Sequence, residues 1–210
     1  MRIASRLLAG LLLWLALAMP ASAAVTITFW SHELGNSFPH AFFTLRGTPD
    51  AGGPPVDANY AFTPKAITPA MLFGTIPGRL DIAKPGYIRG SDAQFSLTIS
   101  DTHYAAILAL VRQWGDPATR YDLKTRNCVH FTKEAARLLG LTGIDQPKLM
   151  KKPRSYLKAV ARANAGRVTI LGIHGKTHLA TLPPLSGTAD TNPARVLLPA
   201  GSAPATAGHD

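Results

Sequence analysis

Residues 120–141 have the sequence RYDLKTRNCVHFTKEAARLLGL, which contains a clear helix signal and the only cysteine of the chain. Asn127 is a residue type that caps helix N-termini, and Gly140 is one that ends helices. The stretch therefore predicts a helix from Cys128 to about Leu139. Its apolar residues recur at the spacing of one helix face, which needs another layer to pack against: Cys128, Phe131, Ala135, Leu138 and Leu139.

The surrounding segments supply that layer as β-strands. Alternating β-branched and aromatic residues predict strands at 25–32 (VTITFWSH), 39–47 (PHAFFTLRG), 58–62 (ANYAF), 93–100 (AQFSLTIS) and 167–173 (RVTILGI). Further helices are predicted at 101–114, capped by Ser100 or Asp101, and around 154–163. Residues 63–90 are rich in Pro and Gly and are predicted to be mostly loop, with a short helix near 69–73. Strands followed by helices predict an α+β fold with an antiparallel sheet.

The N-terminus, MRIASRLLAGLLLWLALAMPASAAV, has the pattern of a secretory signal peptide. Arg2 and Arg6 precede an apolar run, and small residues follow it, so we expect cleavage after about Ala23. A retained membrane anchor is the alternative, although the apolar run is short for a membrane span. The expected location is periplasmic or secreted. There, one cysteine cannot form an intrachain disulfide.

We expect a signal peptide at 1–23, one domain at 24–174, and a disordered Pro- and Ala-rich tail at 175–210. Cleavage would leave a net charge of +8, which favours anionic partners such as the surface of the cell envelope. A basic, solvated surface is the simpler explanation. The basic residues are dispersed and no nucleic-acid motif is present, so no nucleic-acid partner is expected.

Cys128 is either a buried core residue or a nucleophile. A cysteine on an apolar helix face is ordinary in a protein core. As the first residue of its helix, however, Cys128 would lie beside free backbone N–H groups that lower a thiol pKa and can bind an oxyanion.

A cysteine nucleophile needs a base, which is usually a histidine held by a third polar group. His40, at the start of the 39–47 strand, is the expected base. Asn59, which begins the next strand, is the expected orienting group, with His32 as the alternative. His130 is the nearest histidine in sequence, but at i+2 on a helix it points away from Cys128.

The order of FPHAFFTLRG (38–47), NYAF (59–62) and YDLKTRNCVHFTKEAARLLGL (121–141) resembles the circularly permuted papain-like amidohydrolases. That group includes permuted relatives of the NlpC-type cell-wall peptidases, the PPPDE-type isopeptidases and the lecithin:retinol acyltransferase group. In these families the histidine strand precedes the cysteine helix. The resemblance implies a permuted papain-like fold with Cys128 as nucleophile, His40 as base and Asn59 as orienting group. Pro39 stands where many relatives have Gly, and the third group varies among such families.

Three functions follow as hypotheses. The first is a secreted cysteine hydrolase that cleaves an amide, with a peptide or a peptidoglycan-like molecule as substrate. The second is a lipid acyltransferase or thioesterase with the same thiol, and the third is a non-catalytic envelope-binding module. No cofactor or metal is expected, because the only His pair at i, i+4 spacing, His174 and His178, lies at the edge of the expected tail.

Overall fold

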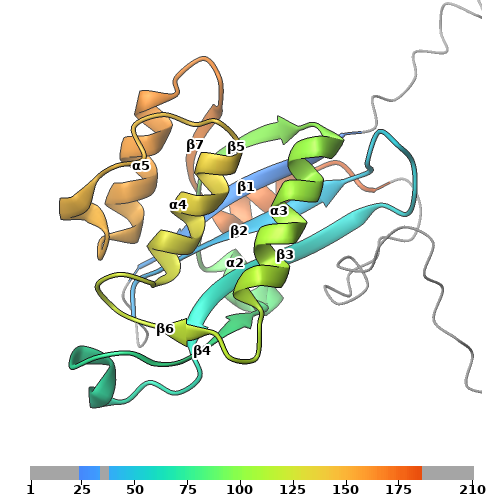
Figure 1. The fold of residues 1–210 in the computed structure, drawn as a ribbon. Helices are drawn as coiled ribbons and strands as arrows, with labels where there is room; N and C mark the ends of the chain where they lie inside the picture. Colours follow the sequence, from blue (N-terminus) through green and yellow to red (C-terminus); the bar gives the residue numbers. More distant parts are fainter. Residues whose placement is uncertain (1–23, 34–37, 186–210) are drawn as a thin grey trace, which may run out of the picture.

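The computed structural model describes residues 24–33 and 38–185 and has a seven-stranded antiparallel sheet as its centre (Figure 1). The strand order is β6-β4-β3-β2-β1-β5-β7. The expected α+β class is therefore confirmed. The strands are β1 (Val25–His32), β2 (His40–Gly47), β3 (Val56–Pro64), β4 (Ile76–Asp81), β5 (Asp92–Ile99), β6 (Arg120–Tyr121) and β7 (Thr169–His174).

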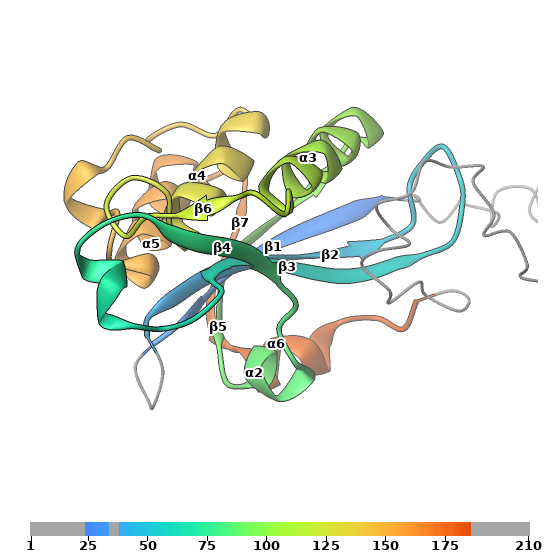
Figure 2. The ribbon, with the colours of Figure 1, turned by 60° about the horizontal axis from the view of Figure 1, so that its bottom comes forward.

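Helices cover both faces of this sheet (Figure 2). One face carries α3 (Asp101–Trp114), α4 (Cys128–Leu138) and α5 (Pro153–Ala163), and the other carries α2 (Pro85–Arg89) and α6 (Gly175–Thr181). Two short 3-10 helices, η1 (Pro69–Leu72) and η2 (Pro147–Leu149), lie in the connections. The expected helix at 69–73 corresponds to η1.

The alternation of side chains along the central strands divides the core in two. Ala41, Phe43 and Leu45 of β2 face α3, α4 and α5, whereas Phe42 packs with Trp30 under α2 and α6. Phe131 of α4 stacks on Phe43 with ring centroids 5.2 Å apart. The apolar face of α4 therefore packs against the middle of the sheet, and this packing fixes the position of the helix start.

Most strands and long helices lie where the sequence pattern predicts them, but residues 63–90 do not. The prediction that this region is mostly loop is wrong, because it also contains β4 and α2. Pro77 and Gly78 interrupt the alternation that would reveal a strand, and β4 is held instead by pairing with β3, for example Phe62 with Leu80.

The expected tail at 175–210 begins with a packed helix, so the folded part of the chain extends beyond residue 174. His178 of α6 is buried, and its ring lies edge-on to Trp30 at a centroid distance of 5.3 Å. The polar, small-residue composition conceals this helix because it buries few large side chains. The expected signal peptide, 1–23, and the rest of the tail, 186–210, lie outside the described residues.

Within the described ranges, none of the helices has the length and apolar character needed to cross a membrane.

Candidate active site

Asn127 fixes the start of α4 and with it the position of Cys128. Its side-chain oxygen accepts hydrogen bonds from the backbone N–H groups of Val129 at 2.8 Å and His130 at 3.2 Å. Its amide nitrogen donates to the carbonyl oxygens of Leu123 at 2.9 Å and Met150 at 2.8 Å. The predicted N-cap is confirmed, and Cys128 is the first residue of the helix. A single buried side chain therefore ties the helix start to the loops on either side.

Cys128 and His40 line the same small cavity, of about 100 Å³. The cavity lies where β2 begins and β3 ends, and its walls come from segments far apart in the sequence. Most of the wall is apolar, and among the described residues that line it Lys151 is the charged one. The full lining is Phe38, Pro39, His40, Phe62, Thr63, Pro64, Ile67, Met71, Tyr121, Leu123, Asn127, Cys128, Val129, Met150, Lys151 and Pro153.

The Cys128 thiol is almost fully buried, with 6% of its surface exposed, and this burial raises its pKa to about 11. The nearby backbone N–H groups of Ala41, Val129 and Cys128 itself pull the pKa the other way, but they do not outweigh the loss of solvation. The lowered pKa expected at a helix N-terminus is therefore not found. At neutral pH the resting thiol is protonated.

His40 begins β2 and lies directly opposite His32 of β1. Burial and, to a smaller extent, the positive charge of His32 lower the pKa of His40 to about 4. The imidazole is therefore neutral at pH 7 and able to accept a proton. Its ring is stacked along Phe42, with centroids 6.5 Å apart, and no hydrogen bond joins it to the Cys128 sulfur. The contact between β2 and the sulfur comes instead from the N–H of Ala41, the next residue.

The register places His32, the alternative third group, beside His40. Ser91 Oγ donates to the Tyr87 carbonyl oxygen at 2.8 Å, so it can accept a hydrogen bond from His32 Nδ1, 3.0 Å away. The His32 ring also stacks on Tyr87 at a centroid distance of 4.1 Å. These contacts hold His32 rigidly and favour the tautomer with its proton on Nδ1, which leaves Nε2 as an acceptor.

Asn59 is not brought to His40. It pairs with Thr44, four residues further along β2, which corresponds to roughly 13 Å along an extended strand. Both ends of its amide are used by Ala83, whose N–H donates to the Asn59 oxygen at 2.6 Å and whose carbonyl accepts from the Asn59 nitrogen at 3.2 Å. Asn59 therefore holds the connection after β4 against β3 and does not orient the imidazole.

Three further histidines of the described residues have structural positions. His130 forms a capping box with Asn127 and lines a separate groove between α3 and α4. His174 caps α6, accepting from the N–H of Lys176 at 3.4 Å, and His178 is buried against Trp30. In residues 24–33 and 38–185, no three His, Cys, Asp or Glu side chains are grouped so that they could hold a metal ion.

Two features of the site could not be predicted from the sequence. The Ala41 N–H is a backbone group, and only the packing of α4 on β2 brings it to the sulfur. Lys151 and Met150 come from the connection after η2, which no motif marks. The KLMKKPR run at 148–154 is a visible cluster of positive charge, but nothing in the sequence links it to Cys128.

Comparison of the chain with models of protein families, with curated proteins and with solved structures finds no match.

Proposed function

We propose that the protein is a cysteine hydrolase in which Cys128 attacks an amide carbonyl and His40 serves as the base. The observation that carries this proposal is the shared cavity: a cysteine at the first position of a helix, an imidazole at the start of a strand, and backbone N–H groups near the sulfur. The resemblance to the permuted papain-like amidohydrolases adds the same assignment from the order of the motifs.

The proposed reaction begins from neutral partners. As the Cys128 Sγ–C bond forms, the thiol proton passes to the neutral His40 ring and the carbonyl electron pair moves to the oxygen. The Cys128 N–H, which lies beside its own sulfur at the start of α4, can donate to that oxyanion. Collapse breaks the C–N bond, and His40 returns the proton to the leaving amine. Water then attacks the thioester with His40 again accepting the proton, which passes to the sulfur as it leaves.

The two pKa values favour general-base catalysis over a resting thiolate. With the thiol raised to about 11 and the imidazole lowered to about 4, a thiolate–imidazolium pair is the minor form. Attack also requires the His40 ring to turn from Phe42 towards the sulfur, as catalytic contacts often tighten only when substrate is bound. His32 is the positioning residue in this proposal, because it faces His40 across the strand pair.

A peptide or a peptidoglycan-like stem peptide is the proposed substrate, in a periplasmic or extracellular setting. This choice rests on the expected signal peptide and on the resemblance. The test is hydrolysis of muropeptides and of simple peptide amides, followed by mass spectrometry. Wild type should release a new amine, and Cys128→Ala should release none. Full cleavage by Cys128→Ala would end the proposal. Fatty acyl groups trapped on Cys128, without any cleaved amide, would point to lipid acyl transfer instead.

A specific observation favours a second candidate, a non-catalytic binding module. A buried thiol with a raised pKa is what a core cysteine would have, and the His40 ring is not bonded to it. Under this reading Cys128→Ser would leave binding to envelope material unchanged, and no acyl group would ever form on the sulfur. Acylation of Cys128 therefore separates the two candidates.

A further inference from the structure

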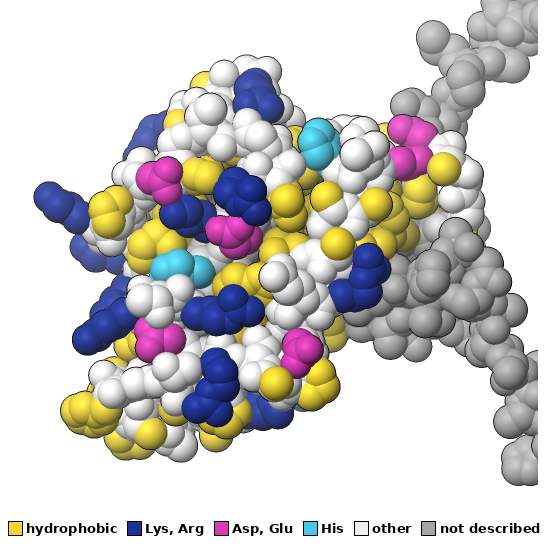
Figure 3. All heavy atoms as spheres, in the orientation of Figure 1, with side chains coloured by type: hydrophobic (Ala, Val, Ile, Leu, Met, Phe, Trp, Pro, Cys, Tyr) yellow, Lys and Arg dark blue, Asp and Glu magenta, His cyan; other side chains and the backbone are white. Residues whose placement is uncertain are grey.

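Four large hydrophobic side chains are exposed together at one end of the molecule. Phe73 is 87% exposed, Ile67 64%, Leu72 57% and Phe38 54%, and we call these four residues the apolar tip. The first three lie in the connection from β3 to β4, which projects from the sheet in Figures 1 and 2. In Figure 3, hydrophobic side chains gather over this projecting segment, at the lower left.

The short helix η1 and its anchor in the core hold the tip residues of the β3–β4 connection in place. Pro69 opens η1, and two turn hydrogen bonds close it: Met71 N–H to the Thr68 carbonyl at 3.1 Å, and Phe73 N–H to the Ala70 carbonyl at 3.1 Å. Met71 is 5% exposed and packs into the core, so it anchors the turn. The flanking hydrophobic residues are directed outward as a consequence.

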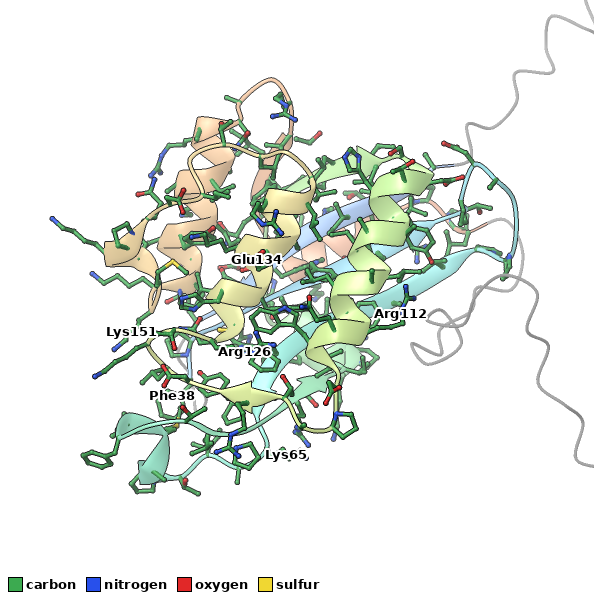
Figure 4. The ribbon with its side chains drawn as sticks, in the orientation of Figure 1. Phe38, Lys65, Arg112, Arg126, Glu134 and Lys151 are labelled. Carbon is green, nitrogen blue, oxygen red and sulfur yellow. The ribbon has the colours of Figure 1, made fainter. Side chains whose placement is uncertain are left out.

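The tip is continuous with the Cys128 cavity. Ile67 and Phe38 line the cavity and are also exposed outside it, so they form part of its rim. Lys151 is the charged residue of the same lining, and Figure 4 shows Phe38 and Lys151 next to each other above the η1 connection. A partner that covers the tip would therefore also cover the mouth of the cavity.

The charged residues in the connection that bears the tip and in the lining of the cavity are lysines. Lys65 is the only charged residue from Pro64 to Pro77, and the neighbouring stretch MKKP (150–153) adds Lys151 and Lys152. All three lysines are exposed, and neither stretch contains an acid. The whole chain has a formal charge of +10. The partner is therefore expected to offer hydrocarbon for the tip and anionic groups for the lysines.

We infer that the apolar tip docks the protein on the surface of an anionic lipid bilayer. Aromatic and aliphatic side chains flanked by lysines suit the boundary between acyl chains and anionic headgroups. A polysaccharide or a soluble acidic peptide would attract the lysines but leave Phe73 in water. The docked orientation turns the mouth of the cavity towards the membrane. Docking does not require Cys128 to be catalytic.

The test places a tryptophan at the tip. The variants are Phe73→Trp and the control Ile170→Trp; Ile170 is also hydrophobic, lies on β7 and is 52% exposed. Each variant is mixed with two kinds of vesicle. One contains phosphatidylglycerol and phosphatidylethanolamine, and the other contains phosphatidylcholine alone. The emission of Phe73→Trp, after subtraction of wild type, should move to shorter wavelength with the anionic vesicles only. Brominated lipids should quench it. The proposal would be overturned if Phe73→Trp gave no response or if Ile170→Trp gave an equal one. A shift in emission when Phe73→Trp is concentrated without vesicles would also overturn it, because that shift indicates self-association.

A second arm measures binding by vesicle flotation. Leu72→Ser combined with Phe73→Ser should lower the bound fraction by about tenfold or more, because both side chains lose their hydrocarbon contacts. Lys151→Glu with Lys152→Glu should also weaken binding and reduce its dependence on salt. Ile170→Ser and Lys158→Glu are the matched controls and should bind as wild type does. Equal losses in the controls would contradict a local docking site. Urea midpoints verify that each variant is folded.

Discussion

At the scale of single residues, the environment of Cys128 combines two opposing influences. Backbone N–H groups from β2 and from the helix start favour a thiolate, whereas burial in a mostly apolar cavity disfavours it and raises the pKa to about 11. In the proposed reaction, the Cys128 thiol therefore attacks only while a base takes its proton. His40, neutral because burial lowers its pKa to about 4, is the group in the cavity that can do so.

The pH dependence expected for the proposed hydrolysis follows from these two pKa values. The base must be unprotonated, so activity should rise as pH increases through about 4, where an ordinary histidine would give a rise near 6.5. Activity should then stay level until the thiol ionises near pH 11. The measurement is kcat/KM between pH 3.5 and 9. A half-maximal rate near pH 6.5 would contradict a half-buried His40 that stays neutral above pH 4.

His32 offers a second residue-scale prediction. His32→Ala removes the ring that faces His40, so kcat should fall while KM changes little, because His32 does not line the cavity. It also removes the charge that lowers the His40 pKa, so the acid limb of the profile should move to higher pH. Asn59→Ala is the control and should leave both the limb and kcat unchanged. A shift with Asn59→Ala but none with His32→Ala would reverse this assignment.

At the scale of elements, the helix start is held by one capping side chain. Asn127→Ala removes an oxygen that accepts two N–H groups and an amide that bonds two distant carbonyls. We expect a loss of about 2 kcal/mol in the free energy of unfolding. Ser100→Ala, which removes the single cap bond of α3 at an exposed site, should cost about 1 kcal/mol or less. Urea unfolding measures the free energy of unfolding of both variants. Equal losses in the two would contradict a bridging role for Asn127.

The bounds of α4 can be predicted because its signals are local in the sequence, whereas the properties of the site depend on residues far apart in the sequence. Asn127 and Gly140 mark the ends of α4 in the sequence, and the structure has the cap at Asn127 and a positive φ at Gly140. The partner of His40 depends instead on the strand register, which pairs Gly47 with Val56 and so carries Asn59 to Thr44. The pKa of Cys128 depends on how deeply the loops around Leu123 and Met150 bury it. No spacing in the sequence encodes that depth.

At the scale of the whole molecule, the sheet needs cover on both faces. α6 closes the face that holds Trp30 and Phe42, and its first residue packs tightly: the Gly175 N–H donates to the Ser91 carbonyl at 2.7 Å, and a Cβ there would collide with the Ile88 carbonyl oxygen. A short helix can cover a large aromatic residue with few apolar side chains of its own. The sequence of α6 therefore has few apolar residues, and its composition resembles that of the tail.

Two truncations test this boundary. A chain that ends at residue 185 keeps α6 and should unfold at the same urea concentration as the full chain. A chain that ends at residue 174 exposes part of Trp30 and Phe42 and should lose about 2 kcal/mol or more. Trp fluorescence during unfolding reports both. Equal midpoints for the two truncated chains would place the end of the folded domain at β7.

The most direct measurement of the central claim, that Cys128 is a nucleophile served by His40, is acylation by a small ester. An acetyl group suits a cavity of about 100 Å³, so p-nitrophenyl acetate serves as the probe. Intact mass and peptide mapping should show one rapid acetyl group on Cys128 in wild type, none at that position in Cys128→Ala, and acetylation slower by about a hundredfold or more in folded His40→Ala. Acetylation of lysines alone, or an unchanged rate in His40→Ala, would contradict it.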